Sequence, residues 1–544
     1  MQPLTRRRCC SHLRGGALSI FRSALRQSLK PSSPNTFYSP LPFWLVRRNH
    51  NVTNAVNAPQ NSQNADAIVV GGGAAGIAVV GNLLEVMPQG RIVWIDRSFM
   101  GGSIGQLYRE VPSYSPAGDF LQYAQALKLF RDICDAAPKP NVMTTLQSLD
   151  PEMTCPLHHA ADMLTFISDN LIQHPRVEPV LGTVTHSVRD PKARQWTITL
   201  TPNHDIGTIT PDPQQQQQDL SQQQQQQQHQ HQHLHQHLQH PPHSQHHPQK
   251  YKHTAPLLIY CTGTRPKTTD LPLPLSRLTL DTCLSPTRLS RLLAADRPRT
   301  VAVIGSGHAA VLVLRGLVGL VEAGSHPLLR VRWFVRDGIG RGMGGGFGGI
   351  GGVGMGGGGG EAVRFAQEML EGGWLAEEGG QLAEEGERRA EEGAGRFITR
   401  LVIPPMEAGH RAMKKGLEGV DYVVEDAGFV RGRLPEVRPG LGVLQGPVGK
   451  PKNLVFNAPT GSFYPNGGSR DHVLGLFGAG SAFPDVDRSV AGWGQPAIGV
   501  WEFMKSVQRM VPRWVQVSKT RHVVKRDDRD WGGRGKKFRE SRYF

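Results

Sequence analysis

The sequence predicts an α/β protein with two doubly wound, mostly parallel sheets. An apolar strand, a glycine-rich turn and an amphipathic helix follow one another over residues 66–87 and again over 300–322. Each group is followed by a second apolar strand, at 91–96 and 330–336. Strand, helix and strand in succession form the βαβ unit from which parallel sheets are built. Two such starts therefore predict two separate sheets.

The segments between these starts differ in composition. A helix-rich region, 117–174, and short strands, 176–200, complete the first unit. A Gln/His tract at 212–249 lies between two strand-like runs and predicts a long loop, and its irregular histidine spacing favours an expanded repeat over a metal site. A Gly/Glu-rich insert, 338–395, interrupts the second unit, and we expect its later part, 361–392, to be helical and solvated.

Charge is concentrated at the two ends of the 544-residue chain. Residues 1–65 and 505–544 each carry a net charge of +9, which leaves −2 for residues 66–504 out of the total of +16. A near-neutral body with two basic ends is typical of an enzyme with appendages, and no nucleic-acid partner is expected.

The N-terminal end has the pattern of a targeting segment. Arg22, Arg26 and Lys30 recur every four residues beside an apolar helical face, and the segment contains serines but no acidic residue. Residues 1–63 are therefore predicted to be a mitochondrial transit peptide, the alternative being a disordered basic arm on a cytoplasmic protein. No stretch approaches the 18 to 20 apolar residues of a membrane span.

The first glycine turn has the form GxGxxG. Gly71 would make the tight turn, Gly73 would let the backbone approach a pyrophosphate, and Gly76 would let helix and strand pack closely. Between the glycines, Ala74 and Ala75 begin the helix, whose N-terminus favours phosphate. The turn is predicted to bind a dinucleotide.

The second strand of this unit ends in Asp96, 25 residues after Gly71, with Arg97 next to it. A carboxylate at this place accepts hydrogen bonds from the hydroxyls of an unphosphorylated adenosine ribose. The spacing therefore strengthens the prediction of a dinucleotide site.

The second turn has the form GxGxxA, with Gly305, Gly307 and Ala310, and His308 serves as a spacer within it. When the strand end "VWID" is aligned with "WFVR", Arg336 takes the place of Asp96. A guanidinium there can pair with a 2′-phosphate. The second turn is therefore predicted to bind NADPH, unless Arg336 is only a solvated charge.

These motifs resemble the pyridine nucleotide-disulfide oxidoreductase superfamily of FAD/NAD(P)-binding flavoproteins. The resemblance also includes "LLIYCTGTRP" at 257–266 and "HVLGLFGAGSAFPD" at 472–485. It implies two Rossmann-like domains, with the NAD(P)H domain inserted in the FAD domain, and FAD in the first turn. Thr262 and Gly263 would lie at the crossing strand of the family.

The late segment departs from the usual Gly-Asp pair, because it has Gly480 and Ser481. The resemblance therefore implies that Ser481 or the nearby Asp485 binds the flavin ribityl chain.

The predicted domain layout follows from the resemblance and the composition. It comprises the N-terminal segment 1–63, the first part of the FAD domain 64–211, the insert 212–249, the crossing strand and linker 250–299, the NAD(P)H domain 300–435 with its insert 338–395, the second part of the FAD domain 436–510 and a basic tail 511–544.

The cysteines argue against disulfide reduction. The six residues, Cys9, Cys10, Cys134, Cys155, Cys261 and Cys283, include no close pair in the predicted folded body. Without a redox pair, the flavin would pass electrons to oxygen, a quinone or a small substrate. This favours the monooxygenase-like branch of the superfamily, although no catalytic side chain can be named.

A loop at 108–116, "YREVPSYSP", loosely resembles the flavin-side loop of N-hydroxylating monooxygenases. Tyr108, Arg109 and Ser113 would then line a substrate pocket, the alternative being an ordinary loop that packs its tyrosine.

Three functions are consistent with the sequence. The first is an NADPH-dependent flavin monooxygenase with a small-molecule substrate. The second is a mitochondrial NAD(P)H:quinone dehydrogenase, whose tail would rest on a membrane surface through Val511, Trp514, Val515 and Val517. The third is a redox-sensing flavoprotein that acts through protein interactions.

Overall fold

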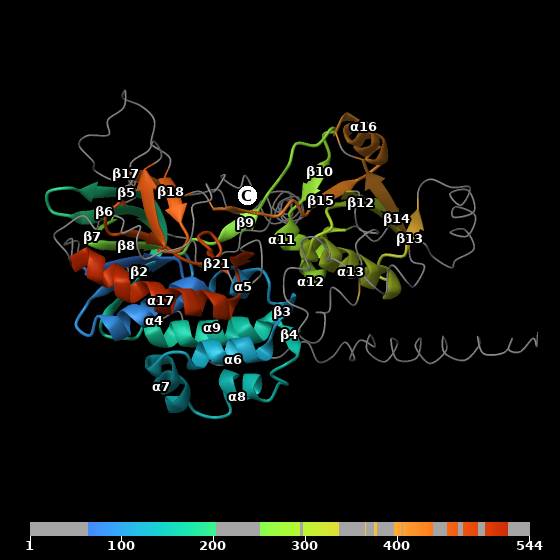
Figure 1. The fold of residues 1–544 in the computed structure, drawn as a ribbon. Coiled ribbons are helices and arrows are strands. Elements are labelled where there is room, and N and C mark those ends of the chain that lie inside the picture. The colour runs from blue at the N-terminus through green and yellow to red at the C-terminus, as the bar shows by residue number, and fades with distance from the viewer. Residues whose placement is uncertain are drawn as a thin grey trace, which may run out of the picture. The chain divides into compact units, whose positions relative to one another are not determined.

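The computed structural model describes residues 64–202, 251–293, 297–336, 365, 375–377, 397–404, 406–432, 434–438, 454–465, 472–487 and 495–519. The predicted transit peptide and the Gln/His tract lie outside these residues, so both predictions stay predictions. The described residues form an α/β fold with two large sheets (Figure 1).

The first sheet has ten strands around a parallel centre. The order is β18-β19-β20-β8-β1-β2-β5-β6-β7, and β17 pairs with β5. Neighbours from β20 to β5 run parallel, and both flanks are antiparallel. The strands in chain order are β1 (Ala67–Val70), β2 (Ile92–Asp96), β5 (Val177–Asp190), β6 (Gln195–Pro202), β7 (Tyr251–Ala255), β8 (Leu257–Tyr260), β17 (Glu436–Arg438), β18 (Leu454–Asn457), β19 (Ser462–Pro465) and β20 (Leu476–Gly478).

The helices of this part include the one that follows the first glycine turn, and α17 lies alongside it in Figure 1. The helices are α4 (Ala74–Val86), α5 (Gly102–Gln106), α6 (Ala117–Gln125), α7 (Lys128–Ala136), α8 (Val142–Gln147), α9 (Leu157–Leu171) and α17 (Val500–Lys519). The central strands β1 and β8 are buried at every position, because parallel strands are covered on both faces.

The second sheet has six parallel strands in the order β10-β15-β11-β12-β14-β13. Its strands are β10 (Ser276–Leu278), β11 (Arg299–Ile304), β12 (Leu329–Arg336), β13 (Leu375–Glu377), β14 (Ile398–Ile403) and β15 (Tyr422–Glu425). Its helices are α11 (Leu280–Cys283), α12 (Pro286–Leu292), α13 (His308–Glu322) and α16 (Met406–Gly416).

Three two-stranded sheets complete the fold: β3 (Pro112–Pro116) with β4 (Thr154–Pro156), β9 (Thr264–Pro266) with β16 (Phe429–Arg431), and β21 (Asp485–Asp487) with β22 (Gln495–Ala497).

The insert 338–395 is not wholly solvated. Within it, Leu375–Glu377 form β13, which pairs with β14, and Phe365 packs against the core of the second sheet. The expectation of a solvated helix over 361–392 is therefore wrong for the strand Leu375–Glu377, whereas Phe365 is helical as expected but partly buried. A strand can form here because the sheet edge offers backbone partners that composition alone does not reveal.

The apolar residues predicted to contact a membrane are buried instead. Val511, Trp514 and Val515 lie in α17, are at most 4% exposed and belong to the protein interior. The Trp514 ring stacks on Phe477 with centroids 5.0 Å apart. The membrane-surface prediction is wrong for these side chains. No described helix is long and apolar enough to cross a membrane.

Candidate functional site

The first glycine turn follows β1 at the centre of the parallel strands. Gly71 has a φ of +120°, and a Cβ atom there would stand 2.2 Å from the Cys261 carbonyl oxygen. A Cβ atom at Gly76 would stand 1.9 Å from the Gly71 carbonyl oxygen. Because neither position has room for a side chain, both glycines are required for the fold itself.

Gly73 differs because the space beside it is open. It is the N-cap of α4, and a Cβ atom would meet only Gly102 Cα at 3.6 Å and the Gly101 carbonyl oxygen at 4.0 Å. As a glycine, Gly73 has no side chain with which to cap α4, and the first turn of α4 holds no acidic residue. The helix start at Ala74 and Ala75 therefore offers backbone N–H groups and a positive dipole end to an anion.

Asp96 ends β2 and lies against this turn. Its Oδ2 accepts the Gly72 N–H at 2.7 Å, and its Oδ1 accepts the N–H groups of Ser98 and Phe99 at 2.9 and 2.8 Å. These bonds hold the carboxylate in place and leave acceptor capacity for ribose hydroxyls. Arg97, the next residue, is exposed.

The loop after Asp96 crosses the turn, which the sequence analysis did not predict. Gly101 and Gly102 have φ angles of +71° and +67°, and a Cβ atom at Gly102 would stand 2.7 Å from Gly73 Cα. The adjacent glycines were the available signal, because two left-handed residues in a row allow such a close crossing.

The late segment brings further predicted residues to the first turn. Gly480 has a φ of +89°, and a Cβ atom there would stand 2.6 Å from Ala75 Cβ. Ser481 Oγ lies 3.9 Å from the Cβ position of Gly263. The glycine turn, the loop at Gly263 between β8 and β9, and the late segment therefore lie close together.

Thr262 Oγ1 is buried and has no hydrogen-bond partner among the described residues. A buried hydroxyl in this state is destabilising by about 1–3 kcal/mol. A polar ligand seated at this convergence would supply the missing partner, so the residues present fit a dinucleotide such as FAD.

Arg431, which the sequence analysis missed, also lies beside the late segment. Its Nε donates to the Ala482 carbonyl oxygen at 2.9 Å, and its guanidinium carbon lies 4.4 Å from the Phe483 ring centroid. Burial lowers the pKa of Arg431. Its strand partner in β9 is Thr264, two residues after Thr262. No ion pair joins Arg431 to a carboxylate within the described part of the chain, which leaves its charge for an anionic ligand.

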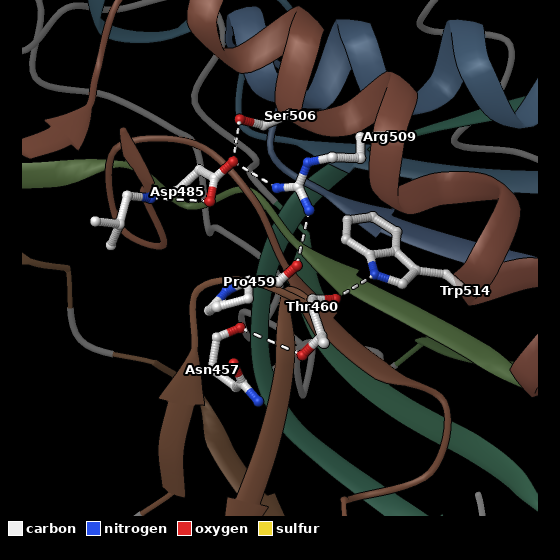
Figure 2. A network of polar contacts seen from close by, with 8 residues as sticks. Asn457, Pro459, Thr460, Asp485, Ser506, Arg509 and Trp514 are labelled. Carbon is white, nitrogen blue, oxygen red and sulfur yellow. Dashed lines mark hydrogen bonds and ion pairs between the residues drawn. The ribbon is translucent and has the colours of Figure 1, made fainter. Parts of the chain in front are cut away.

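Asp485 serves the fold rather than an open site. Figure 2 shows its carboxylate paired with Arg509, and Ser506 donates to the same Oδ2 at 3.1 Å. Arg509 also donates to the Pro459 carbonyl oxygen at 2.9 Å. Asp485 therefore anchors α17 to the late segment, and Ser481 is the better placed of the two predicted ribityl ligands.

The second glycine turn follows β11. Gly305 has a φ of +126°, and Gly307 is the N-cap of α13. The Ala310 N–H donates to Asp426 Oδ2 at 3.0 Å. The His308 ring lies 6.3 Å from the Tyr114 ring, and burial is the main cause of its lowered pKa. The turn has the predicted backbone, but a carboxylate that was not predicted lies in it.

The alignment of the two strand ends was wrong by one residue. Trp94 Nε1 donates to the Gly71 carbonyl oxygen at 2.9 Å, and Trp333 Nε1 donates to the Gly305 carbonyl oxygen at 2.8 Å. Because these tryptophans are equivalent, Val335 rather than Arg336 takes the place of Asp96.

Arg336 is therefore the equivalent of Arg97. It ends β12, where it pairs in register with Ile403. The second unit has no carboxylate at the ribose position and has an arginine one residue further along.

The loop residues predicted to line a pocket are committed to other contacts. The Tyr108 hydroxyl donates to Asp281 at 2.6 Å, Arg109 pairs with Asp162 at 2.8 Å, and Ser113 Oγ donates to a backbone carbonyl at 2.6 Å. The ordinary packed-loop alternative therefore fits these side chains better.

Of the described cysteines, none forms a disulfide. They are Cys134, Cys155, Cys261 and Cys283. Burial raises the pKa of each thiol, to about 11 for Cys134 and about 12 for Cys283. Raised pKa values disfavour the thiolate that disulfide exchange requires.

A parallel sheet with a GxGxxG turn, an acidic second-strand end and a converging late segment defines the class of dinucleotide-binding oxidoreductases. The chain is 31% identical over 459 residues to the monooxygenase AgnR1 of Paecilomyces divaricatus, which covers 83% of this chain and 98% of that protein. The chain belongs to the FAD/NAD(P)-binding flavoprotein superfamily that includes the pyridine nucleotide-disulfide oxidoreductases, in the same family as this monooxygenase.

More distant likenesses exist among solved structures. The ornithine N-hydroxylase KtzI of Kutzneria sp. 744 matches 84% of this chain and 100% of its own at 12% identity and a TM-score of 0.46. The bacillithiol disulfide reductase of Bacillus cereus matches 84% and 99% at 12% identity and a TM-score of 0.41. Likenesses this distant do not distinguish a monooxygenase from a disulfide reductase.

A cyclohexanone monooxygenase matches 50% of this chain at 14% identity and a TM-score of 0.29, and this chain covers 40% of its length. No protein-family model matches the chain.

Proposed function

We propose that this chain is an FAD- and NADPH-dependent monooxygenase that acts on a small molecule. The observation that carries the proposal is the 31% identity to a monooxygenase over 98% of that protein. The arrangement around the first turn supports a bound dinucleotide there. The described cysteines form no disulfide and have raised thiol pKa values, which disfavours disulfide exchange.

FAD would be held by residues from three parts of the chain. The helix start after Gly73 would bind the pyrophosphate, Asp96 the adenosine ribose, and Thr262 and Ser481 the remaining polar groups. Bound FAD would supply the redox chemistry, by taking electrons from NADPH and delivering them to oxygen.

NADPH would be held by the second turn. Gly305 and Gly307 let backbone approach the pyrophosphate, and Arg336 supplies a positive charge one residue beyond the ribose position. The ribose position of the second unit holds Val335 in place of a carboxylate such as Asp96, so no negative charge there would repel a 2′-phosphate.

The quinone dehydrogenase alternative loses its main support, because the apolar side chains expected to contact a membrane lie in the protein interior. No described contact favours it or a redox-sensing role.

The test uses the purified full-length protein. Anaerobic NADPH should bleach a yellow flavin spectrum, and added oxygen should then restore it faster than a soluble quinone does. Glutathione disulfide should be inert as an acceptor. Two outcomes would refute the proposed function. One is a protein that is colourless as purified and does not bind added FAD; the other is a reduced flavin that is reoxidised by quinone but not by oxygen.

A further inference from the structure

We propose that Asp426 controls the access of the NADP(H) pyrophosphate to the second turn. In the free protein its carboxylate occupies the phosphate position, and it must withdraw before the dinucleotide binds. This inference rests on the proposed function, because it presupposes that the second turn is the nicotinamide dinucleotide site.

The two turns provide an internal comparison, because Cys261 and Asp426 are equivalent residues. The Cys261 N–H donates to the Val70 carbonyl oxygen at 2.7 Å, and the Asp426 N–H donates to that of Ile304 at 2.8 Å. Each residue therefore follows the strand next to its glycine turn in the same register.

Their backbones also approach the turns in the same way, and we call the space between each glycine turn and this neighbouring backbone its cradle. The Cys261 carbonyl oxygen would lie 2.2 Å from a Cβ atom on Gly71, and the Asp426 carbonyl oxygen 2.5 Å from one on Gly305. The two cradles thus share one backbone design.

The side chains make the cradles different. A Cβ atom on Gly73 would meet only Gly101 and Gly102 at ordinary contact distances, whereas one on Gly307 would stand 2.4 Å from Asp426 Oδ2. The same oxygen accepts the Ala310 N–H at 3.0 Å. The first cradle is open, and the second contains a carboxylate bonded to the helix start.

A carboxylate and a pyrophosphate compete for the same interactions. Both are stabilised by the N–H groups and the positive dipole end at a helix N-terminus, and they repel one another at short range. Dinucleotide binding must therefore include the cost of breaking the Ala310 contact and moving Asp426. The affinity for NADP(H) is lower than the cradle alone would provide.

Two substitutions distinguish the effect of a side chain that fills the second cradle from the effect of its negative charge. Asp426→Ala empties the cradle and removes the charge, whereas Asp426→Asn removes the charge but keeps an oxygen for Ala310. The loss of one charge-assisted hydrogen bond and one repulsion predicts about 10- to 100-fold tighter NADP⁺ binding for Asp426→Ala. The effect of Asp426→Asn should be smaller.

The binding test is titration calorimetry of NADP⁺ into the full-length flavin-loaded protein. Asp421→Asn serves as the matched control, because Asp421 immediately precedes β15 but its carboxylate contacts Arg299 and the Thr300 N–H. This control should keep the wild-type dissociation constant. Unchanged or weaker binding by Asp426→Ala would overturn the proposal.

A second test needs no nucleotide. Gly307→Ala places a Cβ atom against the carboxylate, so it should lower the melting temperature in the wild-type background and have little effect when combined with Asp426→Ala. An equal effect in both backgrounds would show that the carboxylate does not fill the cradle, and would overturn the inference.

Failure of the proposed function has a different signature. If Gly307→Leu combined with Asp426→Ala binds NADP⁺ as tightly as Asp426→Ala alone, the second turn is not the dinucleotide site. If that double variant loses binding while Asp426→Ala alone shows no gain over wild type, the site stands and only the role of Asp426 fails.

Discussion

Substitution of Gly73 should remove FAD without unfolding the protein. A Cβ atom there would have no neighbour closer than 3.6 Å, so the Cβ atom of a Gly73→Leu variant fits without displacing backbone. The side chain would extend into the space beside the N-terminus of α4, where we place the FAD pyrophosphate. Gly73 has a φ of −82°, which any residue adopts, so no backbone strain is expected.

The magnitude follows from the contacts that a displaced pyrophosphate would lose. Charge-assisted hydrogen bonds contribute about 1.5–3 kcal/mol each. Loss of one such bond weakens FAD binding by roughly 10- to 150-fold, since each 1.4 kcal/mol is a factor of ten. Loss of two multiplies these factors, to roughly 100- to 20,000-fold, so the flavin should be lost during purification.

Gly71→Ala is the contrasting control. Its Cβ atom would collide with the Cys261 carbonyl oxygen, and its φ of +120° is strained for any residue with a side chain. This variant should lose folding and flavin together.

The assay is the ratio of absorbance at flavin and protein wavelengths, measured beside circular dichroism and the melting temperature without added FAD. The expected result is a folded, colourless Gly73→Leu protein. A folded Gly73→Leu protein with full flavin content would refute the placement of FAD at the first turn.

Three further predictions concern other parts of the chain. Arg336→Glu should raise the Michaelis constant for NADPH by about 10- to 150-fold, the equivalent of a lost charge-assisted contact, and should change that for NADH far less; equal changes would contradict a 2′-phosphate contact. Excision of residues 212–249 should leave flavin content and melting temperature nearly unchanged, because β6 and β7 on either side are antiparallel neighbours; loss of folding would show a structural role. Burial lowers the pKa of His158 and His308, so the unfolded chain binds more protons at these sites than the folded chain does. The free energy of unfolding should therefore fall as the pH drops below about 6.5. A His308→Gln variant whose melting temperature has the same pH dependence as that of the wild type would contradict this for His308.

The elements predicted most accurately were those encoded locally. The apolar runs and glycine spacing placed β1, α4, β11 and α13, because a tight turn between a buried strand and a helix demands particular residues at adjacent positions. Such requirements are visible in the sequence without knowledge of the fold.

Features that depend on pairing between distant segments could not be predicted in the same way. The correct alignment of the two strand ends depends on the Trp94 and Trp333 hydrogen bonds to their glycine turns. Asp426 lies more than 100 residues after the turn it fills. Only sheet order shows which strand end lies beside a given turn.

The C-terminal helix was misjudged for a different reason. Its basic residues suggest a solvated tail, but its apolar residues have helical spacing: Val507, Met510, Val511, Trp514 and Val515. These positions recur at intervals of three and four, which is the pattern of one buried helical face. A basic composition describes the exposed face and does not exclude a buried one.

The difference between the two glycine turns matches two different demands on a dinucleotide site. In the enzyme that we propose, FAD must stay bound through many reactions, whereas NADPH must arrive and leave in each one. An open cradle, such as that beside Gly73, gives its ligand the full benefit of the helix N-terminus. A cradle that holds its own carboxylate subtracts the cost of displacing it, and because the carboxylate must withdraw before the dinucleotide binds, this cost lowers affinity mainly by slowing association. Asp426→Ala should therefore speed NADP⁺ association more than it slows release, which stopped-flow mixing can measure. An association rate equal to that of the wild type, with only slower release, would mean that Asp426 need not withdraw before the dinucleotide enters, and would contradict the proposed control of access.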